Sequence, residues 1–334
     1  MKKIFFTWNG LGDNLVLIGA AYNYFLKFGE RPVLGVPSMI YSELFEHADF
    51  VDWCNFDAMH VENRNKTISM CHANGLEPIF LSAVGYRWFQ PGRKSNITIW
   101  NNKHLMLRIS ERMGLSGSIR IEMPLKSNIP HCSGDLLEKV GSGYICIMTG
   151  GLQRYKAVRA EIMQGVVDSL KKDFKFVQVG SKNDELLFDV TDCRGTSILD
   201  SIQLLQKSCF LISATGGLVH LAAAAHCKTF VLQTTGEPLS IGYYPANRYV
   251  MAIDACNICA RNWRDPQHQP CFYGYKCINN LTIDRVLEML MSELPYLIQS
   301  DAYPVNVLNA IPDIASGLED YYNYEKTLKY NAML

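Results

Sequence analysis

A regular alternation of strand-like and helix-like segments is the feature that most constrains the fold of this chain. Short apolar runs of strand length, such as residues 3–8, 31–36, 144–148 and 174–180, are each followed by helical patterns. Such alternation is typical of parallel sheets whose crossover helices cover both faces. We therefore expect an α/β protein with two doubly wound halves that face each other across a cleft, with ligands at the carboxyl ends of the strands.

The chain is long enough for two domains. Its 334 residues exceed the usual size of one domain, and an apolar fraction of 48% supports a core in each half. A polar stretch bearing Pro, Gly and Ser between residues 125 and 143 interrupts the alternation and predicts a linker. We place the first domain at residues 1–135, the second at 136–295, and a tyrosine-rich tail at 296–334. Asn101 is the predicted cap of a helix that runs to Met113.

Charge and cysteine content exclude several classes of protein. Thirty-two basic residues balance thirty-two acidic ones, so no overall charge attracts nucleic acid or anionic lipid. The N-terminus lacks the pattern of a signal peptide, and no apolar run reaches the length of a membrane span. We expect a cytoplasmic protein, with the inner face of the membrane as a further location. Its eleven cysteines are then free thiols or metal ligands rather than disulfides.

The first strand-to-helix turn, Asn-Gly-Leu-Gly-Asp-Asn at residues 9–14, contains an acidic residue, Asp13. Glycine-rich turns of this kind usually bind phosphate, but the carboxylate of Asp13 would repel one. Leu15 also stands where a dinucleotide-binding turn has its third glycine. Asp13 could instead accept a proton from a substrate hydroxyl. The structural alternative is that Asp13 caps the helix by accepting a backbone N–H.

A second glycine turn precedes a helix of small residues. Gly216 and Gly217 follow a predicted strand and leave the amides of the next helix open to an anion such as a diphosphate. His220 lies in the first turn of that helix. It either contacts a nucleotide or is a packing histidine with its own hydrogen-bond partners.

A third turn gathers positive charge. Gly150 and Gly151 follow the strand predicted at residues 144–148, and Arg154 and Lys156 come shortly after them. Such a cluster suits a diphosphate leaving group. A solvated basic face is the alternative. Near the end of the second half, the turn at residues 235–238 contains Glu237, whose carboxylate could accept from a sugar or ribose hydroxyl, unless it is an ordinary surface turn.

Four cysteines lie within a short segment of the second half. The two-residue spacing at the start of the set lets both sulfurs face one point, so four thiolates could hold one metal ion. His268 could replace one of them. Sulfur ligation suits zinc or iron, and a closed four-sulfur site would be structural, for example at a subunit contact. Buried free thiols are the alternative. The four residues are Cys256, Cys259, Cys271 and Cys277.

With these motifs the chain resembles the family 9 glycosyltransferases, the ADP-heptose:heptosyltransferase group. The matching segments are the turn ending at Asp13, the basic segment ending at Lys156, the block Gly-Gly-Leu-Val-His-Leu-Ala-Ala-Ala, and the Thr-Gly-Glu-Pro turn. The resemblance implies the GT-B fold, with two Rossmann-like domains and a tail that packs back on the first. It also implies an inverting sugar transfer in which the first half holds the acceptor and the second half a nucleotide-sugar.

The resemblance also implies roles for individual residues. Asp13 falls where the family has its proposed general base, Lys156 where it has a phosphate-binding lysine, and His220 within its Gly-x-x-His-Leu motif. Thr215 stands where the family usually carries an acid. The cysteine cluster resembles the iron-holding finger of the heptosyltransferases that modify bacterial autotransporters.

We therefore predict an enzyme that moves a sugar, with heptose from ADP-heptose favoured, to a glycan, lipid-linked or protein acceptor. The sequence contains no Asp-x-Asp motif, so we expect no catalytic metal. Two alternatives stay open. One is a glycosyltransferase that uses another nucleotide-sugar, and the other is a catalytically silent GT-B scaffold whose cysteine cluster mediates assembly.

Overall fold

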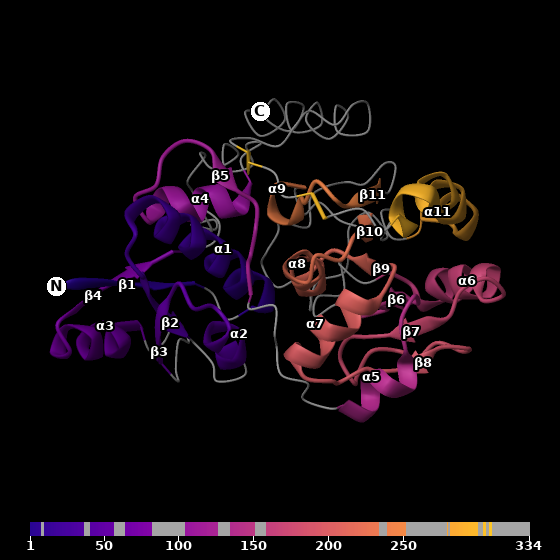
Figure 1. Cartoon of the computed structure of the whole chain (residues 1–334), viewed down its shortest axis with the longest axis horizontal. Helices are drawn as coiled ribbons and strands as arrows, with labels where there is room; N and C mark the ends of the chain where they lie inside the picture. Colours follow the sequence, from indigo (N-terminus) through magenta and orange to yellow (C-terminus); the bar gives the residue numbers. More distant parts are fainter. Residues whose placement is uncertain are drawn as a thin grey trace, which may run out of the picture.

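The computed structural model describes residues 1–7, 10–36, 41–56, 64–81, 104–125, 134–150, 158–233, 239–251, 279, 281–299, 303–304 and 307–308. Within these ranges, the first half of the chain forms a parallel sheet in the order β3-β2-β1-β4 (Figure 1). Its strands are β1 (Lys2–Phe6), β2 (Val33–Val36), β3 (Asp52–Asn55) and β4 (Leu76–Phe80). Its helices are α1 (Leu11–Phe28), α2 (Ser42–Glu46), α3 (Arg64–Ala73) and α4 (Leu105–Arg112).

The second half forms a larger parallel sheet in the order β11-β10-β9-β6-β7-β8. Its strands are β6 (Ile145–Ile147), β7 (Phe176–Gln178), β8 (Thr191–Asp192), β9 (Phe210–Ala214), β10 (Thr229–Gln233) and β11 (Arg248–Met251). Its helices are α5 (Gly134–Val140), α6 (Ala160–Leu170), α7 (Ile198–Lys207), α8 (Gly217–Ala224), α9 (Leu239–Gly242) and α11 (Ile283–Ile298). The strand order reverses between β6 and β9, which makes their carboxyl ends the topological switch point.

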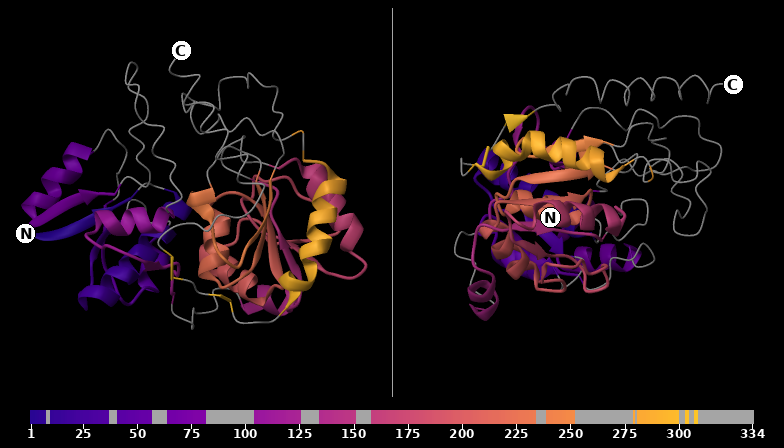
Figure 2. Two further views of the ribbon diagram at one scale, coloured as in Figure 1. Left: turned by 90° about the horizontal axis from the view of Figure 1, so that it is seen from above. Right: turned by 90° about the vertical axis from the view of Figure 1, so that its right-hand side faces the viewer.

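Both faces of the second sheet are buried, as parallel sheets require. Along β6, Ile145 and Ile147 join the core beneath α6 and α11, whereas Cys146 joins the core beneath α7 and α8. Alternate side chains of a strand point to opposite faces, which explains this division. Helix α11 lies beside α6 on the outer side of the second half (Figure 2). The predicted α/β fold with two doubly wound sheets is confirmed.

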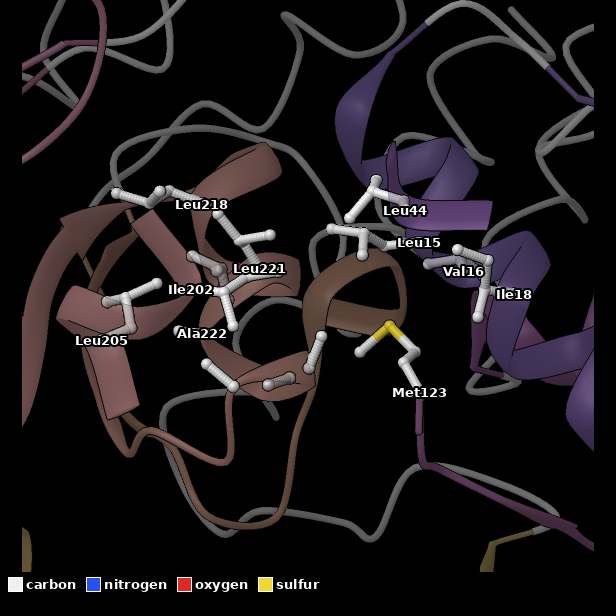
Figure 3. Close-up of a cluster of buried hydrophobic side chains, with 14 of the residues drawn as sticks. Leu15, Val16, Ile18, Leu44, Met123, Ile202, Leu205, Leu218, Leu221 and Ala222 are labelled. Carbon is white, nitrogen blue, oxygen red and sulfur yellow. The ribbon is translucent and has the colours of Figure 1, made fainter. Parts of the chain in front are cut away.

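One of the hydrophobic clusters extends across both halves and joins them. Helix α1 packs against α8 at their junction. Leu15 and Met123 of the first half belong to the same buried cluster as Leu218 and Leu221 of the second (Figure 3). The short strand β12 (Val307–Leu308) also pairs antiparallel with β5 (Ile119–Arg120), so a late segment of the chain returns to the first half. The domain boundaries stay predictions.

One predicted helix start is wrong. Helix α4 begins at Leu105, and its N-cap is His104, whose imidazole Nδ1 accepts the N–H of Met106 at 3.1 Å. Asn101, the predicted cap, precedes this helix by a full turn and lies outside the described residues. Cap preferences favour Asn over His, so propensity alone selected the wrong residue. Every helix in the described ranges falls short of the combined length and apolar character that a membrane span needs.

Candidate functional site

The first turn of α1 carries Asp13 at the carboxyl end of the central strand β1. The N-cap of the helix is Gly10, which has no side chain to cap the free amides. The Asp13 side chain folds back toward this residue, because a Cβ placed on Gly10 would lie only 2.7 Å from Asp13 Oδ2. Asp13 is half-buried and therefore in contact with solvent. Glycine at position 10 thus leaves the space that the carboxylate occupies.

Tyr41 lies near this acid, although no sequence motif pointed to it. It is the N-cap residue of α2, which follows β2, the neighbour of β1 in the sheet. Burial and, to a smaller extent, the negative charge of Asp13 raise the pKa of the Tyr41 hydroxyl. The residue follows a predicted strand, but no local pattern indicates that its side chain approaches Asp13.

The start of α8 meets the start of α1. A Cβ on Gly217 would lie 3.2 Å from Leu11 Cβ and 3.4 Å from the backbone nitrogen of Gly12. Two glycines, Gly12 and Gly217, therefore allow the first turns of the two helices to touch. The contact brings the first turn that carries Asp13 against the glycine turn at the end of β9.

The start of α8 has the properties of an anion site. Its N-cap, Gly216, supplies no side-chain cap, so the first amides of the helix stay available. Just before it, the buried hydroxyl of Thr215 finds no hydrogen-bond partner among the described residues. The turn lies beside the switch point between β9 and β6, where open α/β sheets bind ligands.

Three of the predicted donor-binding residues lie outside the described residues, namely Arg154, Lys156 and Glu237. Their positions relative to Thr215 and the start of α8 stay predictions.

His220 lies at the junction of the two halves. Its Nδ1 is 2.6 Å from the hydroxyl of Tyr244, and its ring is almost fully buried. A Cβ on Gly12 would lie 2.5 Å from His220 Cδ2 and 3.1 Å from Nε2, so the ring packs on the turn that carries Asp13. These contacts explain its burial. A direct contact with a nucleotide stays a prediction.

A second histidine, His104 of the first half, also joins the two halves, although no sequence motif indicated it. His104 Nδ1 accepts the Met106 N–H, so Nε2 carries the proton and donates it to the Tyr243 carbonyl at 2.7 Å. The ring also meets Tyr244 edge-on. Burial lowers the pKa of His104 to about 4, with a smaller contribution from the positive charge of Arg108. No local pattern pairs residues 139 positions apart, so the sequence could not reveal this contact.

The predicted metal site falls outside the described residues. It consists of the four clustered cysteines, Cys256, Cys259, Cys271 and Cys277. Across the part of the chain that the structure describes, no group of three or more His, Cys, Asp or Glu side chains could hold a metal ion. The described cysteines are free thiols; they are Cys54, Cys71, Cys146, Cys193, Cys209 and Cys227.

Two α/β domains with parallel sheets, which meet at the starts of α1 and α8, are typical of the GT-B class of fold. The chain is similar to the iron-containing dodecameric glycosyltransferase TibC from enterotoxigenic E. coli (16% identity, TM-score 0.63, 88% of this chain and 76% of that chain). It is also similar to the E. coli ADP-heptose LPS heptosyltransferase II, with 13% identity and a TM-score of 0.63 over 90% of this chain and 100% of that chain. A third similar structure is the family 9 glycosyl transferase of Veillonella parvula, with 13% identity and a TM-score of 0.61 over 90% of this chain and 98% of that chain. No family model and no curated protein matches by sequence. The predicted resemblance is confirmed at the level of the fold.

Proposed function

We propose that the protein is a glycosyltransferase that moves a sugar from a nucleotide-sugar, with ADP-heptose as the favoured donor. The observation that carries the proposal is the meeting of two helix starts. The half-buried acid Asp13 lies in the first turn of α1, and this turn touches the uncapped start of α8 at Gly217. Among proteins of similar fold, WaaC of E. coli was solved with ADP and TibC with ADP-D-β-D-heptose.

The arrangement suits an inverting transfer. Asp13 takes the proton of an acceptor hydroxyl as that oxygen attacks the anomeric carbon. The bond from this carbon to the diphosphate oxygen breaks on the opposite face of the sugar. The amides at Gly216 and Gly217 then stabilise the negative charge that develops on the diphosphate. Lys156 and Arg154 add positive charge there, so the reaction needs no catalytic metal.

Two further donor contacts belong to the same proposal. The buried Thr215 hydroxyl donates to a phosphate oxygen, which would satisfy a group that has no partner among the described residues. Glu237 accepts from a hydroxyl of the sugar or ribose. The acceptor is a glycan, a lipid-linked saccharide or a protein.

The cysteine cluster has a separate proposed role. Cys256, Cys259, Cys271 and Cys277 hold a structural zinc or iron ion, and the finger contributes to a homo-oligomer. The proposal follows from the cysteine spacing, and TibC, similar in fold, is iron-containing and dodecameric. Elemental analysis of the purified protein should find about one zinc or iron per chain, and Cys256→Ser should lose it. Retention of the full metal content by this variant would refute the assignment.

The donor proposal is tested by a thermal-shift panel of ADP-, GDP- and UDP-sugars. We expect one nucleotide class to raise the Tm selectively. Asp13→Asn should keep this shift and lower the transfer rate by about a hundredfold or more, because the general base is lost. Asp49→Asn, an exposed acid of the same half, is the matched control and should keep full activity. Absence of any shift would favour the silent scaffold, and full transfer by Asp13→Asn would exclude its role as base.

A further inference from the structure

Tyr244 lies at the point where the two halves of the chain meet. It follows α9 and precedes β11, and only 1% of its surface is exposed. Its hydroxyl lies 2.6 Å from Nδ1 of His220 and 3.8 Å from the sulfur of Met123. Met123 belongs to the first half, and its sulfur faces the second half (Figure 3). This one hydroxyl therefore contacts side chains of both halves.

Two histidines, one from each half, hold the ring of this tyrosine. His104 of the first half donates from Nε2 to the carbonyl of Tyr243 at 2.7 Å. Its ring also meets the Tyr244 ring edge-on, with the ring centroids 5.7 Å apart. His220 of the second half meets the Tyr244 ring in the same way, also at 5.7 Å. Edge-to-face contacts of this kind favour one orientation of the ring, so the packing of both halves sets the position of Tyr244.

The hydroxyl of Tyr244 has one proton to donate. Burial raises the pKa of this hydroxyl well above its usual value, which keeps the proton in place. The unprotonated nitrogen of an imidazole is a stronger acceptor than a thioether sulfur, so the hydroxyl donates to His220 rather than to Met123. His220 then accepts at Nδ1 and carries its own proton at Nε2. A proton on Nδ1 would instead leave the tyrosine proton with only the sulfur as acceptor.

The opposite edge of the His220 ring packs on the turn that carries Asp13. A Cβ added to Gly12 would lie 2.5 Å from Cδ2 and 3.1 Å from Nε2 of His220. The ring therefore lies against the backbone of the residue immediately before Asp13. The torsion that turns an imidazole about its bond to Cβ is soft. The hydrogen bond from Tyr244 to Nδ1 thus fixes the angle at which the other edge of the ring meets Gly12.

We propose that Tyr244 is a positioning residue of the sugar transfer, acting through His220 on the turn that carries the general base Asp13. The inference rests on the proposed function, and it adds a residue that is too deeply buried to touch a substrate itself. Small displacements of a catalytic group are costly, because the reacting atoms must meet in one geometry. A displaced Asp13 would still leave the start of α8 open to the donor diphosphate. Loss of the Tyr244 hydroxyl should therefore slow the reaction without weakening donor binding.

Kinetics of Tyr244→Phe in the purified full-length protein test the inference. The donor is the nucleotide-sugar that raises the Tm most in the panel above, water is the acceptor, and the release of nucleoside diphosphate is followed in a single turnover. We expect the release rate to fall about tenfold or more. The Kd of the nucleoside diphosphate should stay within about twofold of the wild-type value. The Tm of each protein is measured to confirm folding.

Tyr243→Phe is the matched control. It removes the hydroxyl of the neighbouring tyrosine and keeps the backbone carbonyl that accepts from His104. Because the Tyr243 hydroxyl is not the partner of His220, this variant should keep the wild-type release rate.

Nitrogen NMR gives a second readout that does not depend on turnover. The wild-type His220 ring should carry its proton on Nε2 and accept at Nδ1. In Tyr244→Phe the amide signals of Gly12 and Asp13 should move, because the ring that packs on this turn has lost its anchor. In Tyr243→Phe the same signals should stay in place.

The outcomes separate the inference from the proposed function. An unchanged release rate in Tyr244→Phe, or unmoved signals of Gly12 and Asp13, overturns the inference and leaves the proposed function intact. Equal losses of rate in the two tyrosine variants also overturn it, because they indicate a general loosening of the junction. A wild-type His220 with its proton on Nδ1 overturns it as well. A wild type that binds none of the nucleotide-sugars, or turns over none of them, overturns the proposed function itself.

Discussion

His220 Nδ1 lies 2.6 Å from the hydroxyl of Tyr244, and the opposite edge of the same imidazole packs on Gly12. His220 and Tyr244 belong to the second half of the chain, whereas Gly12 lies in the first turn of α1 beside Asp13. The hydrogen bond therefore orients a ring that packs on the residue next to Asp13. In this way, a residue of the second half helps to position the first turn of α1 in the first half.

Tyr244→Phe should reveal the value of this bond. The substitution keeps the ring but removes the hydroxyl, so a buried imidazole nitrogen loses its partner. We expect the free energy of unfolding in urea to fall by about 1–2 kcal/mol. Tyr24→Phe, at a half-buried tyrosine of α1, is the control and should change it by less than about 0.5 kcal/mol. Equal stability of the wild type and Tyr244→Phe would show that the bond contributes nothing.

Gly12→Ala should disturb the junction directly. Its new Cβ would lie 2.5 Å from His220 Cδ2, so the buried ring or the helix must shift. Overpacking of this kind costs about 1–3 kcal/mol of unfolding free energy, and the transfer rate should fall with it. Gly242→Ala is the matched control, because no atom lies within 4 Å of its added Cβ. The prediction fails if both variants unfold at the same urea concentration as the wild type.

Stability should depend on pH through His104. Burial lowers its pKa in the folded protein to about 4, below the ordinary value of 6.5. The unfolded chain therefore binds the proton first as pH falls, and the stabilisation, complete above pH 6.5, is lost between pH 6.5 and 4. The difference corresponds to about 3 kcal/mol.

Urea unfolding across this pH range checks the contribution of His104. His104→Asn keeps a side chain that can cap α4 but has no titrating group, so its stability should decline less steeply between pH 6.5 and 4. Parallel pH profiles of the variant and the wild type would assign the dependence to other groups.

Lys228→Met should loosen the end of α11. The buried Lys228 ammonium donates to the carbonyls of Tyr296 and Gln299 at 2.8 and 2.9 Å, and it also lies over the Tyr296 ring. Methionine keeps much of the side-chain volume but cannot donate. We expect a loss of about 1.5–3 kcal/mol of unfolding free energy and faster amide exchange in the last turn of α11. Lys207→Met, an exposed lysine in the last turn of α7, should leave both quantities nearly unchanged.

Local patterns in the sequence were enough to predict the α/β class and the turns at the strand ends. Apolar runs of strand length and glycines that follow them are short-range features, so the turn that carries Asp13 and the start of α8 could both be located from neighbouring residues alone. Cap preferences are a weaker signal than apolar periodicity. They predict Asn101 as the cap, whereas α4 begins after His104.

Which of these turns meet depends on long-range packing, and the sequence pattern does not contain it. The bond from His104 to the Tyr243 carbonyl, the approach of Tyr41 to Asp13 and the position of Asp184 over Gly150 all join segments that are distant in the sequence. Such contacts follow from strand order and from the packing of α1 against α8. Periodicity specifies which face of an element is buried, but it carries no information on which partner covers that face.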